Sequence, residues 1–444
     1  MVRPPFGTWV RGNGWNELDG HLPEPLPTVS VIVTHYDQPR ELRRMLHALE
    51  RQDYPTDLVQ IIVADDGSPD VPAVPPGVEL VRQHDDGFRA AAVRNLGARS
   101  ASGDVLCFLD ADTAPEPGYV RAITRLPALL PEAVTVGRRR HADFSDVTFD
   151  APLENAAELH ELPEPTWLSE AYERSADLLH ADDRSYRYII GAAFACTRWF
   201  YDELGGMDES FTVYGGEDWE WAHRAWQHGA VFAHVRDAVA WHDGPEWAGR
   251  KLDPAERRRD GNAQSLLLTR AIPLDGSRGH GIDTGTPDVV FRLHGRHPDA
   301  ATFVGVDSVL AAFPRARVQL EHGAGTWPFA ADPRVGEVRP DRPDARVVVD
   351  LDRPVALRGA SASALADGIR SLGQGDIGAL SLRAASGETF GRAESRRAHE
   401  RRRRWGTDAA FEVAELDLPD AIVLGDAPAV EAYVGGWAHP HHLA

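Results

Sequence analysis

Three short apolar runs of strand length, separated by helical patterns, constrain the fold of this chain most strongly. They span residues 29–33, 58–64 and 105–109 and are rich in Val, Ile and Leu. Residues 39–51 place apolar side chains at helical spacing after the first run, and residues 87–101 are expected to form a helix before the third. Runs of this kind are typical of strands buried on both faces, so strand–helix–strand alternation predicts an α/β fold with an open, mostly parallel sheet.

Polar side chains follow each run at the point where the strand is expected to end. Thr34 and Tyr36 follow the first run, Asp66 follows the second, and Asp110 and Asp112 follow the third. Ligands bind at the carboxyl ends of the strands in such sheets, so these side chains are expected to meet at one edge. Asp110 and Asp112 are two residues apart in an extended segment, so their side chains can point to the same side and face one site. Carboxylate oxygens there are suitable ligands for a Mg²⁺ or Mn²⁺ ion that carries a phosphate group.

A second acidic pair, Glu217 and Asp218, follows two glycines at the start of an expected helix. Acidic residues in a first helical turn also serve as caps, so this pair alone does not establish a site. We expect Trp226 to face the core, and either Trp219 or Trp221 to contact a sugar ring through its aromatic face. The tryptophans that crowd this region stand at positions 219, 221, 226, 241 and 247.

Together these blocks resemble the nucleotide-binding half of a family 2 glycosyltransferase with the Rossmann-like GT-A fold. The resemblance is carried by VSVIVTHYDQP (29–39), VADDGSPD (63–70) and GFRAAAVRNLGARSASGDVLCFLDAD (87–112). The segment GGMDESFTVYGGEDWEWAHR (205–224) is similar to the acceptor-side segment of galactosyltransferase and chondroitin-polymerase type enzymes. Four such blocks in the expected order are much more specific than any one of them.

The resemblance implies which residues would bind the donor and a metal ion. Asp66 would hydrogen-bond the base of a sugar nucleotide, and Asp110 would contact the ribose or the metal. Asp112 would bind the Mn²⁺ or Mg²⁺ ion that holds the diphosphate, and His242, in Trp241-His242-Asp243, would complete that metal site. The expected donor-binding residues are Thr34, Tyr36, Asp66, Arg89, Arg94 and Asp110.

The expected reaction is metal-dependent, inverting transfer of a sugar from a nucleoside diphosphate, with UDP favoured, to a hydroxyl of a glycan, glycolipid or metabolite. A divalent ion stabilises the departing diphosphate, and a carboxylate must take the proton of the acceptor hydroxyl. The resemblance gives the second role to Asp218, with Glu217 as the alternative.

Two other functions stay open. One is a non-catalytic sugar- or nucleotide-binding scaffold with the same fold. The other is a sugar-nucleotide nucleotidyltransferase, which would need a Gly-rich basic loop where the sequence has THYDQPREL (34–42).

A chain of 444 residues is long for one domain. We expect an N-terminal arm, a transferase domain, a Gly-rich linker and a smaller α/β or α+β accessory domain, over residues 1–27, 28–270, 271–288 and 289–444. The accessory domain contains Asp350-Leu351-Asp352 after an apolar run, which mimics the first acidic motif. It lacks the accompanying blocks, so we do not expect a second catalytic centre there.

A formal net charge of −21 argues against nucleic acid as a partner, since phosphate binding needs a cationic surface. The two cysteines lie in apolar segments and suggest no disulfide framework, which fits the cytoplasm. We find no apolar stretch long enough to span a bilayer. The basic segment 396–404 could touch anionic lipid headgroups at the inner membrane face or form a solvated helix, and the sequence is compatible with a homo-oligomer.

Overall fold

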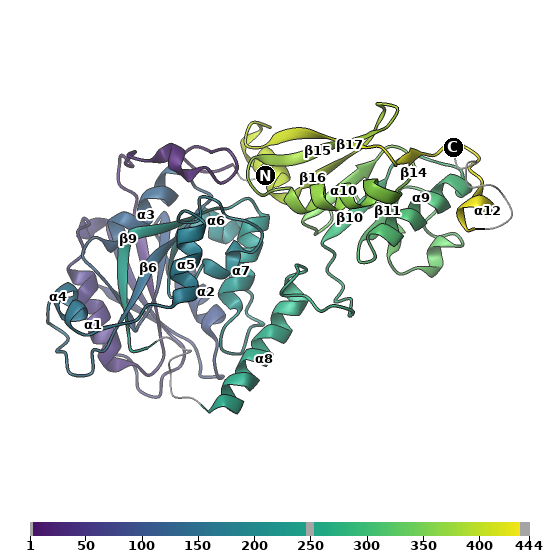
Figure 1. Ribbon diagram of the computed structural model, residues 1–444. Helices are drawn as coiled ribbons and strands as arrows, with labels where there is room; N and C mark the ends of the chain where they lie inside the picture. The colour runs from purple at the N-terminus through teal and green to yellow at the C-terminus, as the bar shows by residue number, and fades with distance from the viewer. Residues whose placement is uncertain (1–2, 246–252, 436–444) are drawn as a thin grey trace. The chain divides into compact units, whose positions relative to one another are not determined.

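The computed structural model describes residues 3–245 and 253–435, and the chain divides into two compact units. The first unit is Met1–Leu268 and the second is Thr269–Ala444 (Figure 1). Each unit has its own sheet and its own helices, so each is described by itself below. No helix within the described ranges is both long and apolar enough to cross a membrane.

The sheet of the first unit has nine strands in the order β3-β2-β1-β4-β8-β6-β9-β5, with β7 paired to β6. Strands β3, β2, β1 and β4 are parallel neighbours, as are β6 and β9, which confirms the predicted α/β fold with an open sheet. Strand β8 joins the two parallel groups in antiparallel pairing. The strands are β1 Val29–His35, β2 Val59–Asp65, β3 Val78–Arg82, β4 Val105–Asp110, β5 Thr113–Pro115, β6 Ala133–Ala142, β7 Glu161–Leu162, β8 Ala193–Thr197 and β9 Val231–Asp243.

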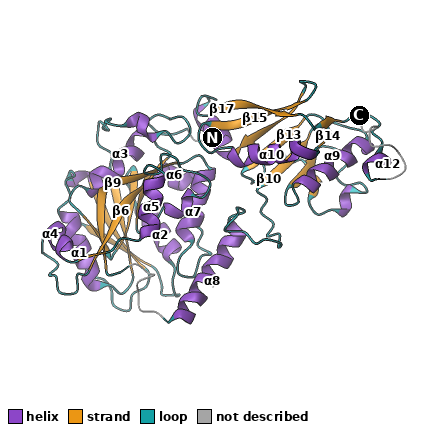
Figure 2. Cartoon of the chain, viewed as in Figure 1, coloured by secondary structure: helices purple, strands orange, loops and turns teal. Residues whose placement is uncertain are grey.

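Helices cover both faces of this sheet, with α1 and α4 on one face and α2 and α7 on the other (Figure 2). Helix α2 crosses the sheet closely at Gly97, where an added Cβ would lie 2.5 Å from Cγ2 of Ile32. This close approach explains a glycine in the middle of a helix. The helices are α1 Pro39–Glu50, α2 Ala90–Ser100, α3 Tyr119–Leu129, α4 Leu153–Leu159, α5 Thr166–Arg174, α6 Arg198–Glu203, α7 Glu217–Gln227 and α8 Pro254–Ala271.

The strand register brings the polar strand ends level with one another. Thr34 of β1 pairs with Asp110 of β4, and His35 of β1 pairs with Asp65 of β2. Strands β1 and β4 are buried apart from Thr34 and Asp110, because both sheet faces are covered. The carboxyl edge of β1, β2 and β4 therefore carries the predicted site residues.

The N-terminal segment is held within the first unit by the buried side-chain amide of Asn13 and by apolar packing. The side-chain nitrogen of Asn13 donates to the carbonyl oxygens of Leu178 and Phe232, at 2.7 and 3.0 Å. Its side-chain oxygen accepts the N–H of Phe232 at 2.9 Å. Val10 is buried beside Leu126 and Leu130 of the α3 region. This segment is thus part of the unit's packing, although it contains only the short 3₁₀ helix Trp15–Leu18.

The second unit has a seven-stranded sheet of order β12-β11-β10-β13-β16-β15-β17 and a small pair, β14 and β18. Its first four strands are parallel neighbours, and β16 and β15 continue the sheet in antiparallel fashion. The strands are β10 Val289–Leu293, β11 Arg317–Leu320, β12 Val335–Glu337, β13 Val347–Leu351, β14 Val355–Ala356, β15 Ile377–Ala384, β16 Thr389–Ser395, β17 Glu412–Leu418 and β18 Ile422–Val423. Its helices are α9 Asp299–Ala312, α10 Gly359–Ser371, α11 Arg396–Trp405 and α12 Val430–Tyr433.

The basic segment 396–404 forms helix α11, but it does not present a row of arginines to solvent. Arg397, Arg401 and Arg404 are buried. Arg402 is paired with Glu394, and Arg403 with Glu400. A basic helix face for lipid headgroups needs exposed cationic side chains, so the predicted membrane contact through this segment finds no support in the structure.

Candidate active site

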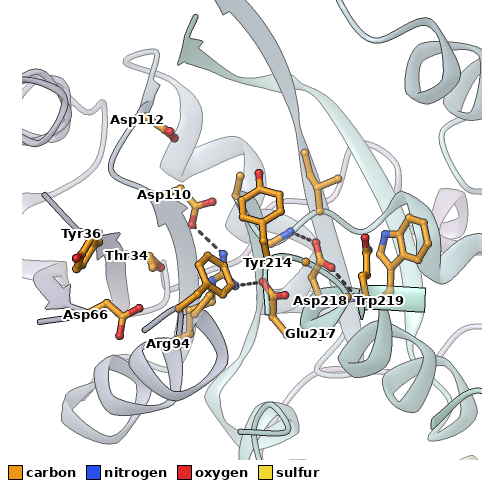
Figure 3. A pocket seen from close by; sticks show the side chains of 18 of the residues that line it. Thr34, Tyr36, Asp66, Arg94, Asp110, Asp112, Tyr214, Glu217, Asp218 and Trp219 are labelled. Atoms are coloured by element: carbon orange, nitrogen blue, oxygen red, sulfur yellow. Dashed lines mark hydrogen bonds and ion pairs between the residues drawn. The ribbon is translucent and has the colours of Figure 1, made fainter. Parts of the chain in front are cut away.

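A pocket of about 670 Å³ lies at the carboxyl edge of β1, β2 and β4 in the first unit. Thr34, Tyr36 and Asp66 lie on one side of it, and Asp218 and Trp219 lie on the other (Figure 3). The pocket brings together ten of the twelve predicted site residues, which are Thr34, Tyr36, Asp66, Arg94, Asp110, Asp112, Glu217, Asp218, Trp219 and His242. The remaining two, Arg89 and Trp221, do not line it.

Asp66 is presented by a tight turn at the end of β2. Its carboxylate accepts hydrogen bonds from the side-chain amide of Gln83 and from the backbone N–H of Arg89, the latter at 2.9 Å. The turn requires Gly67, which has φ of 85° and whose added Cβ would lie 2.3 Å from the backbone nitrogen of Asp85. Burial raises the pKa of Asp66 above its usual range. The hydrogen bonds from Gln83 and Arg89 therefore fix the orientation of this carboxylate at the pocket wall, which recognition of a nucleobase would require.

The prediction that the Arg89 side chain binds the donor is wrong. Its guanidinium pairs with the exposed carboxylate of Asp86 at 3.1 Å and does not line the pocket. Arg89 acts through its backbone N–H, which holds Asp66.

Asp112 and His242 lie side by side because β5 pairs with β9. Thr113, next to Asp112, stands opposite His242 in the antiparallel register. The distance from His242 Nε2 to Asp112 Oδ2 is 3.5 Å, and Gln38 Nε2 donates to the same oxygen at 3.1 Å. The Nδ1 atom of His242 faces the carbonyl oxygen of Gly244 at 3.1 Å, which places a proton on Nδ1 and directs Nε2 toward Asp112.

This pair has the right chemistry for a divalent cation. One carboxylate oxygen and one imidazole nitrogen converge, and the imidazole is oriented by a carbonyl oxygen, as is usual for metal-binding histidines. No group of three or more His, Cys, Asp or Glu side chains poised to hold a metal is found among the described residues. A cation here would thus take its remaining ligands from bound substrate and water.

Asp110, two residues before Asp112, forms an ion pair with Arg94. The guanidinium of Arg94 donates to Asp110 Oδ1 at 2.9 Å and to Glu217 Oε1 at 2.8 Å (Figure 3). Arg94 is 3% exposed and Glu217 is 5% exposed, so both charges are buried and compensated. Glu217 is therefore engaged, which leaves Asp218 as the better candidate for a base.

Asp218 is held at the start of α7 by two backbone N–H groups. Oδ2 accepts from Gly191 at 2.9 Å, and Oδ1 accepts from Trp219 at 2.8 Å. Burial, followed by the charge of Glu217, raises the pKa of Asp218 to about 7. A carboxylate with this pKa titrates near neutral pH and has a much higher proton affinity than an ordinary one, which is what a general base needs.

The aromatic residues divide between the pocket and the core. Trp219 lines the pocket, whereas Trp221 is fully buried with Phe194 and Tyr201 at ring-centroid distances of 5.0 and 5.7 Å. The prediction of acceptor contact is therefore wrong for Trp221. Trp226 is buried, as expected, and Trp247 lies outside the described residues.

Several pocket residues escaped the sequence argument. The exposed aromatic rings of Trp167 and Tyr214 line the pocket, and Phe88 packs on Tyr214 with ring centroids 5.4 Å apart. Asp260 and Gln264 reach it from α8. Trp167 stands on α5, Tyr214 in a loop, and Asp260 and Gln264 on α8, which has no strong apolar stripe. Only the aromatic character of Trp167 and Tyr214 could have marked them as pocket residues in the sequence.

Two family models match most of the part of the chain that forms this pocket, and several relatives match more than half of the chain. Residues 30–174 match the model of glycosyl transferase family 2, and residues 173–239 match that of the N-terminal domain of galactosyltransferase. A chondroitin synthase of Escherichia coli is 28% identical over 315 residues, covering 64% of this chain and 45% of the relative. A validoxylamine A glucosyltransferase of Streptomyces hygroscopicus is 30% identical over 273 residues, covering 55% of this chain and 59% of the relative.

The chain thus spans less than two thirds of either relative. Among solved structures, a mannosyltransferase from Pyrobaculum calidifontis in complex with GDP-Man and Mn²⁺ is 19% identical, with a TM-score of 0.42 and coverage of 59% of this chain and 70% of that chain. The two family models match adjoining segments, and these segments contain the acidic motifs that meet in the pocket. Over residues 30–174 the first unit is thus similar to the family 2 glycosyltransferases, and over residues 173–239 to the N-terminal domain of galactosyltransferase.

Proposed function

We propose that the chain is a metal-dependent, inverting glycosyltransferase that moves a sugar from a nucleoside diphosphate to an acceptor hydroxyl. The observation that carries this proposal is the pairing, in one pocket, of a cation-binding edge with a separate base. Asp112 and His242 form the first, and Asp218, with its pKa raised to about 7, forms the second. A binding scaffold would have no need for a carboxylate of such high proton affinity in the pocket wall.

The donor would lie along the carboxyl edge of β1, β2 and β4. Asp66 would accept a hydrogen bond from the imide N–H of a uracil base, and Tyr36, which is 46% exposed, offers an aromatic face beside it. The hydroxyl of Thr34 is buried and has no hydrogen-bond partner among the described residues, so a substrate group could satisfy it. UDP is thus the favoured nucleotide, although a guanine base also carries an N–H for Asp66.

Asp112 and His242 would hold the divalent cation, and the diphosphate and water would supply its remaining ligands. When bound, that cation would stabilise the negative charge on the departing diphosphate. Gln38 keeps Asp112 oriented through its hydrogen bond to Oδ2. His242 is oriented in the same way through Gly244, so both side chains are positioned before substrate arrives.

Asp218 would take the proton of the acceptor hydroxyl as that oxygen attacks the donor sugar. The N–H groups of Gly191 and Trp219 fix the orientation of its two oxygens. Glu217 is engaged by Arg94, so a single carboxylate performs the proton transfer in one displacement, which supports inversion at the sugar carbon. Trp219 and Trp167 offer flat faces to an acceptor sugar on this side of the pocket.

The proposal is tested by calorimetric titration of UDP, GDP and dTDP, each in Mn²⁺ and again in EDTA. We expect one nucleotide, UDP, to bind only in Mn²⁺. Sugars carried on that nucleotide would then be offered with oligosaccharide and small-molecule acceptors, and transfer would be followed by mass spectrometry with the anomeric configuration read by NMR. Absence of binding by every nucleotide, in the presence of acceptor as well, would contradict an active transferase.

A further inference from the structure

One buried arginine connects the donor side of the pocket to the acceptor side. Arg94, on α2, forms ion pairs with Asp110 at the end of β4 and with Glu217 at the start of α7. These carboxylates stand 16 and 123 residues away in the sequence, so the arginine joins two distant motifs. The planar guanidinium can donate to both carboxylates at once, which an ammonium group cannot do in the same geometry.

The backbone beside Arg94 connects the same two sides a second time. The N–H of Asp110 donates to the carbonyl oxygen of Ala192 at 3.3 Å. The N–H of the preceding residue, Gly191, donates to Asp218 at 2.9 Å. Two neighbouring residues, Gly191 and Ala192, therefore connect the backbone of Asp110 to the carboxylate of Asp218.

Gly191 also leaves the space in which the arginine lies. A Cβ added to Gly191 would lie 3.0, 3.1 and 3.2 Å from Nη2, Cζ and Nη1 of Arg94. Any larger residue would press on the whole guanidinium group, which is enclosed and has little room to move. The absence of a side chain at Gly191 thus leaves room for the guanidinium of Arg94, and the N–H of Gly191 donates to Asp218.

We propose that Arg94, Gly191 and Ala192 form a positioning bridge that fixes the base Asp218 relative to the donor-side carboxylate Asp110. In this bridge Arg94 is a positioning residue, because its guanidinium pairs with a carboxylate on each side of the pocket. The effect of this bridge on catalysis rests on the proposed function, but its effect on the titration of Asp218 can be measured without substrate. A fixed separation matters because a displacement of about 1 Å between reacting groups can cost ~100-fold in rate.

The charges around Asp218 determine what loss of the bridge would do. Glu217 on the same helix raises its pKa, and Arg94 from α2 lowers it. The pocket wall also contains other carboxylate, arginine and histidine side chains, which are His35, Asp66, Asp110, Asp112, Arg139, His242 and Asp260. Removing the positive charge of Arg94 should move the titration of Asp218 to higher pH, and removing the negative charge of Glu217 should move it to lower pH.

The experiment follows the carboxyl band of Asp218 by infrared spectroscopy across pH, as the difference between each protein and its Asp218→Asn version. We expect Arg94→Gln to shift the titration up by about one unit or more, and Glu217→Gln to shift it down. Gly191→Ala should shift it up as well, since it displaces the guanidinium. Arg94→Lys keeps the charge and should shift it less. The matched control is Arg99→Gln, on the same helix, where Arg99 is 61% exposed and pairs only with Glu209 in the described structure.

Affinity for UDP in Mn²⁺ and release of UDP from UDP-glucose provide the second readout. For a positioning role, Arg94→Lys should lower kcat ~10-fold or more while the affinity for UDP changes little. A folded Arg94→Gln protein whose Asp218 titrates as in the wild type would overturn the proposal, as would a loss of UDP affinity without any shift. If Arg94→Gln does not fold, as judged by its thermal unfolding, Gly191→Ala and Arg94→Lys decide the same question. Failure of the transferase function would look different, because wild type and Arg99→Gln would both be inactive while the infrared shifts remained.

Discussion

His242 Nε2 lies 3.5 Å from Asp112 Oδ2, although 130 residues separate the two along the chain. The pairing of β5 with β9 produces this contact, and neither strand has the long apolar run that marks β1 or β4. A carboxylate and an oriented imidazole at this distance are a suitable pair of ligands for one cation.

Replacing Asp112 with Asn should abolish Mn²⁺-dependent binding of UDP, because a neutral amide is a poor ligand for a hard cation. Calorimetric titration in Mn²⁺ and in EDTA measures the effect. Asp57→Asn, at an exposed position of the same unit, is the matched control and should bind UDP as the wild type does. Full binding by Asp112→Asn would remove this residue from the metal site.

Replacing Asp218 with Asn should cut transfer by ~100-fold or more while leaving nucleotide affinity unchanged, because the amide cannot accept the proton. In the wild type, the base is active when ionised, so kcat should rise with pH through about 7, the value to which burial raises the pKa of Asp218. The pH dependence of kcat, measured from pH 5 to 9 in about half-unit steps, tests this. A kcat that is already constant at pH 5 would mean that another group is the base.

Replacing Trp219 and Trp221 with Ala should give opposite results. Trp219 lines the pocket, so its loss should raise the KM for acceptor and leave the melting temperature nearly unchanged. Trp221 is completely buried, so its loss should lower the free energy of unfolding by about 3–5 kcal/mol. Acceptor kinetics and denaturant unfolding of both variants distinguish the two roles, and equal destabilisation by both would contradict the assignment.

Replacing Asp350 with Asn should leave UDP binding intact, even though Asp350-Leu351-Asp352 imitates the acidic motif of the first unit. Both oxygens of Asp350 are held by Arg292, at 2.7 and 2.9 Å, and His294 contacts one of them at 2.7 Å. This carboxylate stabilises the second unit, so the variant should melt at a lower temperature. A decrease in the number of UDP molecules bound per chain would instead indicate a second nucleotide site.

The sequence was sufficient to predict the donor half of the site because that half stands on buried parallel strands. Apolar runs at β1, β2 and β4 identify the strands, and parallel strands end at the same edge, so Thr34, Asp66 and Asp110 had to converge. The metal pair was predicted only through the family resemblance, since β5 has three residues and β9 mixes polar and aromatic side chains.

One wrong prediction and one ion pair that the sequence could not predict have simple physical causes. Trp219 and Trp221 are two residues apart on α7 and so point to different faces, which means that one of them had to be buried; composition could not say which. Arg94 was recognised as a basic residue near the donor, but its partner Glu217 is 123 residues away. Only the folded chain shows that the guanidinium is already neutralised by carboxylates.

Asn13 has a consequence for anyone who shortens this protein. A chain that starts at Thr28 would look reasonable, since the first strand begins at Val29. Such a truncation would remove the side-chain amide that hydrogen-bonds the carbonyl oxygen of Leu178 and both backbone polar groups of Phe232. Three buried polar atoms would then lose this hydrogen-bond partner. Poor expression or aggregation of a trimmed version would therefore reflect a lost internal partner and would say nothing about the transferase site.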